Sequence, residues 1–85
     1  MRPPRRIVKL SLSRRNSTGR AIARLRHDAR PRITQEDLAA RLARQGLPFN
    51  QSQIAKIESG RRPVTDFELT AIARALKVPI AALFE

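Results

Sequence analysis

The chain has 85 residues, no cysteine and a formal net charge of +11, and only 4% of its residues are aromatic. This length allows one domain with a modest core of aliphatic side chains. The lack of cysteine excludes disulfides and thiolate metal sites and suits a reducing cytoplasm, which is the expected location. No apolar run approaches the length of a membrane span, so no membrane partner is expected.

The basic residues are concentrated at one end of the chain. Residues 1–32 hold eleven of the 18 arginines and lysines and a single acid, Asp28, whereas residues 33–85 hold seven bases and six acids. Solubility alone does not explain this asymmetry. It favours a polyanionic partner, and nucleic acid is a better candidate than an anionic membrane.

Residues 1–15 are expected to form a basic, flexible arm, followed by a single domain over residues 16–85. The arm includes a stiff, charged Arg-Pro-Pro-Arg-Arg run at residues 2–6 that cannot build a core. Residues 8–13 alternate between apolar and polar, so a short strand is the alternative; it needs a partner strand, for example from a second copy. In either state the arm can follow phosphates or enter a minor groove.

One local pattern recurs three times in the domain. An apolar residue precedes a capping residue, which is followed three positions on by a polar residue and then by another apolar one. This is the signature of a capping box with a hydrophobic staple, and each copy predicts the first turn of a helix. The three cap pairs are Thr34 with Asp37, Asn50 with Gln53, and Thr65 with Glu68.

These starts and the chain breakers predict an all-α fold, a compact bundle of about five short helices. The first helix runs from caps at residues 16–19 to about Ala29, and the second ends near Gly46. The fourth is broken at residues 78–79, and the apolar residues 80–84 form a last helix that either closes the core or makes a dimer face. The expected core stripes are Ile22 and Leu25, then Leu38, Ala39 and Leu42, then Leu69, Ile72, Ala73 and Leu76.

The third helix, about residues 50–59, has an unusual outer face. Ile54 and Ile57 point inward together, and Gly60 can adopt the left-handed conformation that ends the helix. A solvated face more often carries Glu/Lys pairs, whereas this one carries small side chains and amides, which fit against base edges in a major groove. The residues on this face or its flanks are Gln51, Ser52, Gln53, Ala55, Lys56 and Ser59.

Two runs separated by a turn, TQEDLAARL at residues 34–42 and QIAKIESGR at residues 53–61, resemble the helix-turn-helix of the phage-repressor/Cro family, also called the XRE type. The similarity extends from about Ile22 to Phe84. It implies a lambda-repressor-like domain whose third helix reads the major groove while the second crosses the DNA backbone. The turn at residues 43–49 and the basic segment 30–32 are both longer than in the family. The longer turn bears on the angle between the second and third helices, and therefore on which side chain meets which base.

The resemblance also implies roles for individual side chains in binding double-stranded DNA. Base reading falls to Gln51, Ser52, Ala55 and Lys56, whose groups suit adenine, several base edges, a thymine methyl and guanine in that order. Contacts with the DNA backbone fall to Gln35, Asn50, Gln53, Ser59, Arg61 and Arg62. The alternatives stay open: the four base-reading residues contact phosphates or are idle surface, Gln35 only satisfies its own cap, and Arg61 and Arg62 form a solvated basic loop.

An ion pair is also implied between the first and third helices. The family commonly pairs an arginine of the first helix with the glutamate near the end of the third, and the matching residues here are Arg26 and Glu58. Because an unpaired carboxylate at the edge of a buried side is costly, the pair is expected to hold the reading helix in place. The alternative is an exposed Glu58.

Catalysis, a cofactor and a metal site find no support in the sequence. The single histidine, His27, directly precedes Asp28, so the two cannot share a helix face, and a solvated histidine is expected. Neither a metal-binding spacing nor a Gly-rich phosphate loop is present. The protein is therefore expected not to be an enzyme.

These observations favour a transcriptional regulator that binds a palindromic operator as a homodimer, because one reading helix covers too few base pairs to be selective. Two alternatives remain open. One is an antitoxin-like or adaptor module with a protein partner such as a toxin. The other is a non-specific nucleic-acid binder that acts through the basic arm.

Overall fold

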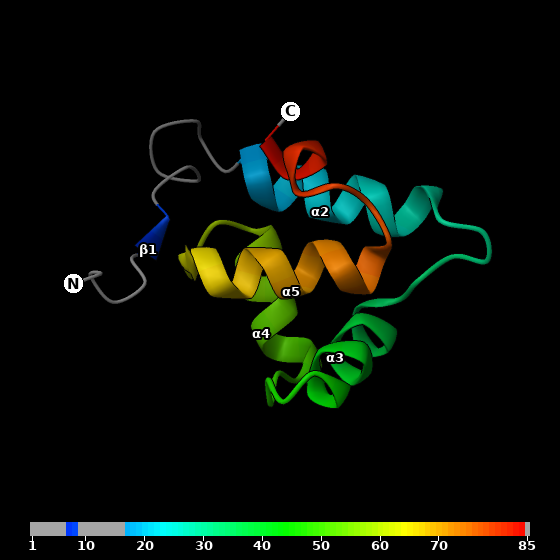
Figure 1. Cartoon of the computed structure of the whole chain (residues 1–85), viewed down its shortest axis with the longest axis horizontal. Helices are drawn as coiled ribbons and strands as arrows, with labels where there is room; N and C mark the ends of the chain where they lie inside the picture. Colours follow the sequence, from blue (N-terminus) through cyan, green and yellow to red (C-terminus); the bar gives the residue numbers. More distant parts are fainter. Residues whose placement is uncertain (1–6, 9–16, 85) are drawn as a thin grey trace.

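The computed structural model describes residues 7–8 and 17–84 of the chain. Within residues 17–84, four α-helices and a final 3-10 helix follow in order: α2 (Ser17–Asp28), α3 (Gln35–Arg44), α4 (Gln51–Glu58), α5 (Asp66–Leu76) and η1 (Ile80–Phe84). Helix α5 crosses the middle of the bundle, with α2 and η1 on one side of it and α3 on the other (Figure 1). The prediction of an all-α bundle of short helices is confirmed.

All three predicted capping boxes are present. The hydroxyl of Thr34 accepts the N–H of Asp37 at 2.9 Å, and a carboxylate oxygen of Asp37 accepts the N–H of Thr34 at 3.1 Å. Each box satisfies two N–H groups that a helix start would otherwise leave unpaired. The same reciprocal pair of bonds joins Asn50 to Gln53 and Thr65 to Glu68.

Two glycines turn the chain after α3 and α4. Gly46 has φ of +88° and Gly60 has φ of +84°, in the left-handed region that residues with a Cβ rarely adopt. Beyond Gly60, the N–H of Arg61 donates to the carbonyl of Lys56 at 2.9 Å, so the chain folds back over the end of α4. The predicted end of this helix is confirmed.

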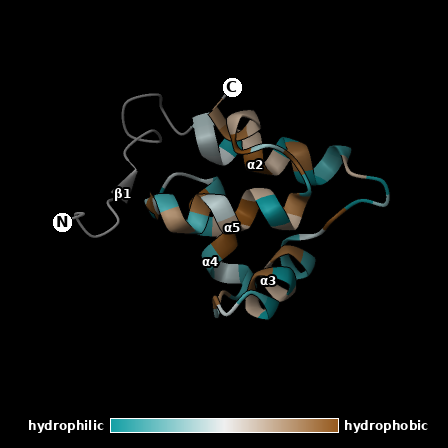
Figure 2. Ribbon diagram, viewed as in Figure 1, coloured by the Kyte–Doolittle hydropathy of each residue, from teal (hydrophilic) through white to brown (hydrophobic). Residues whose placement is uncertain are grey.

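The core lies where the helices face one another. Helix α5 lies at its centre, and its hydropathy pattern suits this position (Figure 2). Hydrophobic and hydrophilic stretches alternate along this helix, as an amphipathic helix requires. Leu83 of η1 is fully buried and closes the core, whereas Ile80 and Phe84 stay 40% and 49% exposed. Leu25 is only half-buried, while the other stripe residues are buried as predicted: Ile22, Leu38, Ala39, Leu42, Leu69, Ile72, Ala73 and Leu76.

Two very short strands complete the described part. β1 (Ile7–Val8) pairs antiparallel with β2 (Val64–Thr65), which leads directly into α5. The partner of β1 therefore belongs to the same chain. Of the strand considered over residues 8–13, Val8 lies in β1, and residues 9–13 are outside the described residues, as are residues 1–6, 14 and 15 of the predicted arm.

Candidate nucleic-acid interface

Helix α4 has one buried side and one open side. Ile54 and Ile57 are 1% and 3% exposed and anchor the helix in the core. Because successive side chains are about 100° apart around a helix, the residues between these two isoleucines point outward. The open side holds the four residues predicted to read bases: Gln51, Ser52 and Lys56 are exposed, and Ala55 is half-buried.

Part of this open side is hollowed. A hollow of about 370 Å³ is lined by Ser52, Ala55, Lys56, Ser59 and Arg61. The hydroxyl of Ser59 donates to the carbonyl of Lys56 at 3.2 Å, which holds it at the end of the helix. The structure thus brings three of the predicted base-reading residues together with two of those predicted to contact the DNA backbone.

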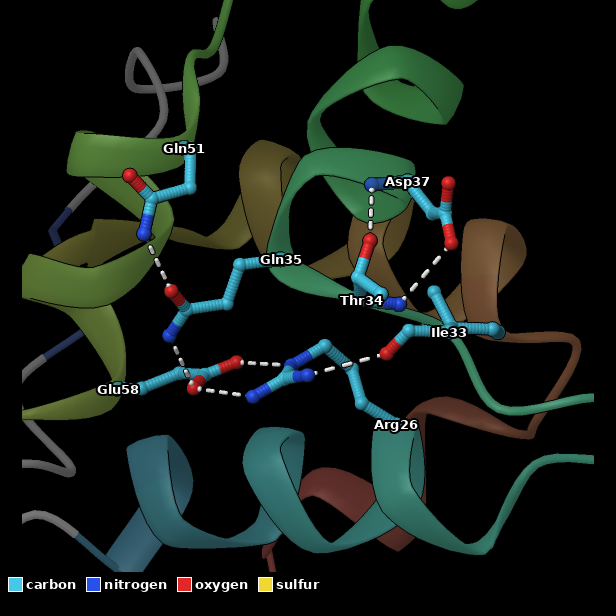
Figure 3. A network of polar contacts seen from close by, with 7 residues as sticks. All are labelled: Arg26, Ile33, Thr34, Gln35, Asp37, Gln51 and Glu58. Atoms are coloured by element: carbon cyan, nitrogen blue, oxygen red, sulfur yellow. Dashed lines mark hydrogen bonds and ion pairs between the residues drawn. The ribbon is translucent and has the colours of Figure 1, made fainter.

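Arg26 and Glu58 join α2 to the end of α4. Nε of Arg26 donates to Oε2 of Glu58 at 2.6 Å, and Nη2 donates to Oε1 at 2.9 Å (Figure 3). The third donor, Nη1, reaches the carbonyl of Ile33 at 3.0 Å. The two charged side chains are each 9% exposed, so the ion pair is largely shielded from water and its hydrogen bonds make up for lost hydration.

The network continues through two glutamines to the open side of α4. Nε2 of Gln35 donates to Oε1 of Glu58 at 2.9 Å, and Oε1 of Gln35 accepts from Nε2 of Gln51 at 2.6 Å. Figure 3 shows these four side chains as one chain of contacts that starts on α2 and ends at the first residue of α4. Gln35 was predicted to contact a phosphate, and the structure places it between Glu58 and Gln51.

The charge of Glu58 decides how both amides are oriented. A carboxylate paired with arginine can only accept hydrogen bonds, so Gln35 must turn its NH₂ group toward Glu58. Its carbonyl oxygen then faces Gln51. Because this oxygen can only accept, Gln51 must donate to it from its own NH₂ group. The orientation of Gln51 is therefore set by the buried ion pair, two side chains away.

Asn50 and Gln53 serve as the capping box of α4. Oδ1 of Asn50 accepts the N–H of Gln53 at 2.9 Å, and Oε1 of Gln53 accepts the N–H of Asn50 at 3.1 Å. Both amide oxygens are thus used within the chain. The NH₂ groups remain as donors, which is the half of the amide that a phosphate oxygen can accept from.

Arg62 is held within the protein. Its guanidinium donates to both carboxylate oxygens of Glu68 at 3.2 Å and lies 4.9 Å from the centre of the Phe49 ring. Its side chain is 30% exposed. This residue was predicted to contact a phosphate; in the structure its guanidinium links the turn before α4 to the first turn of α5.

The contact with Arg62 helps to lower the pKa of Glu68. Partial burial raises the pKa of its carboxyl, but hydrogen bonds from Arg62 and from the N–H of Thr65 outweigh it, and the pKa lies below its ordinary value. The charged form is therefore favoured in the folded protein. Arg62, Glu68 and Thr65 act as one unit at the start of α5.

A second hollow adjoins Gln51, and it contains residues that the sequence did not single out as functional. It measures about 390 Å³ and is lined by Arg26, His27, Arg32, Thr34, Gln35, Glu36 and Gln51. His27 was expected to be a solvated histidine, and it is exposed, but it stands at the wall of this hollow. No local pattern could have indicated this, because the wall forms only when α2 packs beside α3 and α4.

No group of three His, Cys, Asp or Glu side chains in the described ranges could hold a metal ion. The helices found among these residues are all too short or too polar to span a bilayer.

Comparison with protein families gives one result. The family model described as a helix-turn-helix domain matches residues 18–84, which is most of the chain and covers the five helices except for Ser17, the first residue of α2. Searches of curated proteins and of solved structures found no match. Helix-turn-helix domains bind DNA through the second helix of the motif, here α4, so DNA is the partner that this match implies. The chain belongs to the helix-turn-helix domain family.

Proposed function

We propose that this protein is a transcriptional regulator of the phage-repressor/Cro type that binds double-stranded DNA in a sequence-specific manner in the cytoplasm. Helix α4 enters the major groove and α3 crosses the DNA backbone beside it. The protein acts by binding and not by catalysis. The observation that carries the proposal is the hydrogen bond from Gln51 to Gln35, because it orients an exposed amide before any DNA arrives.

The groups left on Gln51 suit one base in particular. One hydrogen of its NH₂ group is donated to Gln35. One N–H donor and the amide oxygen are left to bind a base. Adenine presents one acceptor, N7, beside one donor, N6–H, in the major groove. A side chain already held in place loses less conformational freedom on binding, so the contact costs less than one from a free glutamine.

The rest of the open side supplies further readout and anchoring. Ser52, Ala55 and Lys56 are the other proposed base-reading residues, and they line the hollow beside α4. Arg61 closes this hollow with a positive charge at the end of the helix, where a phosphate is expected. The other proposed backbone contacts come from Gln35, Asn50, Gln53 and Ser59, and Arg62 contributes less because its charge is paired with Glu68.

We propose further that two copies bind together on a palindromic operator. The outer side of η1 supports this, since Ile80 and Phe84 are large apolar residues that are 40% and 49% exposed. Covering large exposed apolar side chains is favourable, so these two residues are candidates for a protein interface. A second copy would cover them and double the number of base pairs read.

The test is selection of binding sites from a random duplex library at physiological salt, followed by the same selection with Gln51→Ala. We expect the wild-type chain to enrich a palindrome with half-sites about one helical turn apart. The variant should lose its preference at one symmetric pair of positions, where the wild-type chain selects adenine. Binding that depends on salt but enriches no sequence would refute sequence-specific recognition and leave only electrostatic attraction.

A further inference from the structure

We propose that Arg32 and His27 form a binding site for one phosphate of the DNA backbone, next to the base that Gln51 reads. This inference rests on the proposed function, and it concerns the hollow of about 390 Å³ between α2, α3 and α4. The sequence assigned neither residue a role in binding.

Most cations near the hollow have partners inside the protein. Each of the three guanidinium nitrogens of Arg26 already donates a hydrogen bond, two of them to Glu58 and one to the carbonyl of Ile33, and the side chain is largely buried. Arg30, on the neighbouring loop, donates to the carbonyls of His27 and Ala29. Among residues 17–84, neither an acid nor a carbonyl pairs with the guanidinium of Arg32, so this is the charge left for a ligand.

Gln35 cannot supply the anchoring contact alone. Its oxygen accepts from Gln51 and one of its two N–H donors goes to Glu58, so a single neutral donor remains. A phosphate held in this region therefore needs its main contact from elsewhere. Arg32 provides a planar guanidinium that can bind two phosphate oxygens at once, and the imidazole of His27 can donate from a ring nitrogen.

The position relative to Gln51 identifies the ligand. Gln51 forms part of the same wall, and its amide is held where it can meet a base edge. The backbone of the strand that carries this base runs along the rim of the groove, so a phosphate lies close to each base contact. Arg32 and His27 thus face the backbone while Gln51 faces the base.

One residue in the hollow opposes an anion. Glu36, in the first turn of α3, also lines the wall, and its carboxylate repels a phosphate bound there. The two charged residues of the wall should therefore have opposite effects on DNA affinity. Removing the positive charge of Arg32 should weaken binding, whereas removing the negative charge of Glu36 should strengthen it.

The experiment measures affinity of the full chain for a labelled duplex by fluorescence anisotropy over a series of salt concentrations. It compares the wild type with Arg32→Ala, Arg32→Lys, His27→Ala, Glu36→Gln and, as a matched control, Arg74→Ala on the exposed side of α5. Circular dichroism and urea unfolding check that each variant is folded. A second series replaces single phosphates of the duplex by uncharged methylphosphonates.

We expect Arg32→Ala to reduce the slope of log K against log salt concentration by about 0.9, the value for one lost phosphate contact on B-DNA. Arg32→Lys should restore most of the wild-type slope. His27→Ala should weaken binding less than Arg32→Ala does, and Glu36→Gln should strengthen binding. One methylphosphonate should weaken the wild type but not Arg32→Ala. An Arg32→Ala slope equal to that of the wild type, or a loss no larger than that of Arg74→Ala, would overturn the proposal.

The outcome is separable from the proposed function. If selection finds no preferred sequence, the salt series is run on a duplex of arbitrary sequence, where phosphate contacts still operate. A reduced slope for Arg32→Ala then supports the phosphate site although sequence-specific recognition has failed. An unchanged slope on a selected operator refutes the phosphate site and leaves the proposed function standing.

Discussion

Gln51 is hydrogen-bonded to Gln35 over 2.6 Å, although the two residues belong to different helices and lie sixteen positions apart. The same Gln35 is held by Glu58, so the orientation of the exposed Gln51 amide depends on a charge in the interior. This relationship links the stability of the fold to the precision of the proposed base contact.

Replacing Gln35 by methionine should relax base preference more than it lowers overall affinity. Methionine keeps the length of the side chain but frees Gln51, which must then be ordered by the DNA itself. We expect part of the about 1–3 kcal/mol that a good bidentate contact contributes to discrimination to be lost. Fluorescence anisotropy on the selected operator and on a duplex with the adenine replaced measures this discrimination. If the variant discriminates between the two duplexes as well as the wild type does, the proposed role of Gln35 is wrong.

Glu58→Gln should destabilise the fold by about 3–5 kcal/mol, because it leaves the charge of the buried Arg26 uncompensated. The double variant Arg26→Met with Glu58→Leu should recover much of this loss, since it buries no charge. Urea unfolding measures both. The double variant should still read its operator poorly, because Gln35 has lost the acceptor that orients it.

Arg61 and Arg62 should behave differently despite being neighbours. Arg61→Ala should reduce the salt slope of DNA binding by about 0.9 and leave the unfolding curve almost unchanged. Arg62→Ala should cost about 0.5–1 kcal/mol of stability, because it removes a partly exposed ion pair and a contact with an aromatic ring. Its salt slope should stay near that of the wild type; equal slope losses for both variants would show that Arg62 leaves Glu68 to bind DNA.

Stability should fall in acid partly through Glu68. The pKa of this carboxyl is lowered from an ordinary 4.5 by Arg62 and the N–H of Thr65, against the opposing effect of burial. A lowered pKa contributes stability above the unfolded value, and this contribution is lost as pH falls below 4.5 through the folded value. Asp37, whose pKa is lowered by its hydrogen bonds with Thr34, acts in the same direction.

The measurement is urea unfolding at several pH values between about 6 and about 3, with Glu68→Gln as the comparison. The variant should be less stable near neutral pH and should lose less stability in acid. Parallel curves for the two proteins would mean that Glu68 does not contribute to the acid sensitivity.

Phe84→Glu should separate the proposed dimer into single chains. It places a charge on the outer side of η1, where Phe84 is 49% exposed, and leaves the buried Leu83 untouched. Sedimentation analysis in the presence of a palindromic duplex should change from two copies per duplex to one. Circular dichroism should remain that of the wild type, and two copies of the variant on the duplex would argue against this interface.

Local features of this protein could be predicted from the sequence. The three capping boxes at Thr34, Asn50 and Thr65 join residues three positions apart, so the bonds form wherever the helix starts, whatever packs against it. The glycine after α4 and the core stripe of α5 were predictable for the same reason, since both follow from the geometry of a single helix. The pairing of Arg26 with Glu58 was expected only through the resemblance to a known family.

Tertiary structure alone decided which polar side chains meet between different helices and turns. Arg62 meets Glu68 and Phe49, and His27 comes to stand in one wall with Arg32 and Gln51, because helices distant in the sequence pack side by side. Long polar side chains have several partners within reach, and hydrogen-bond geometry with burial selects among them only once the helices are docked. Periodicity in the sequence indicates which side of a helix is buried. It does not indicate which charged residue of a neighbouring helix that side will face.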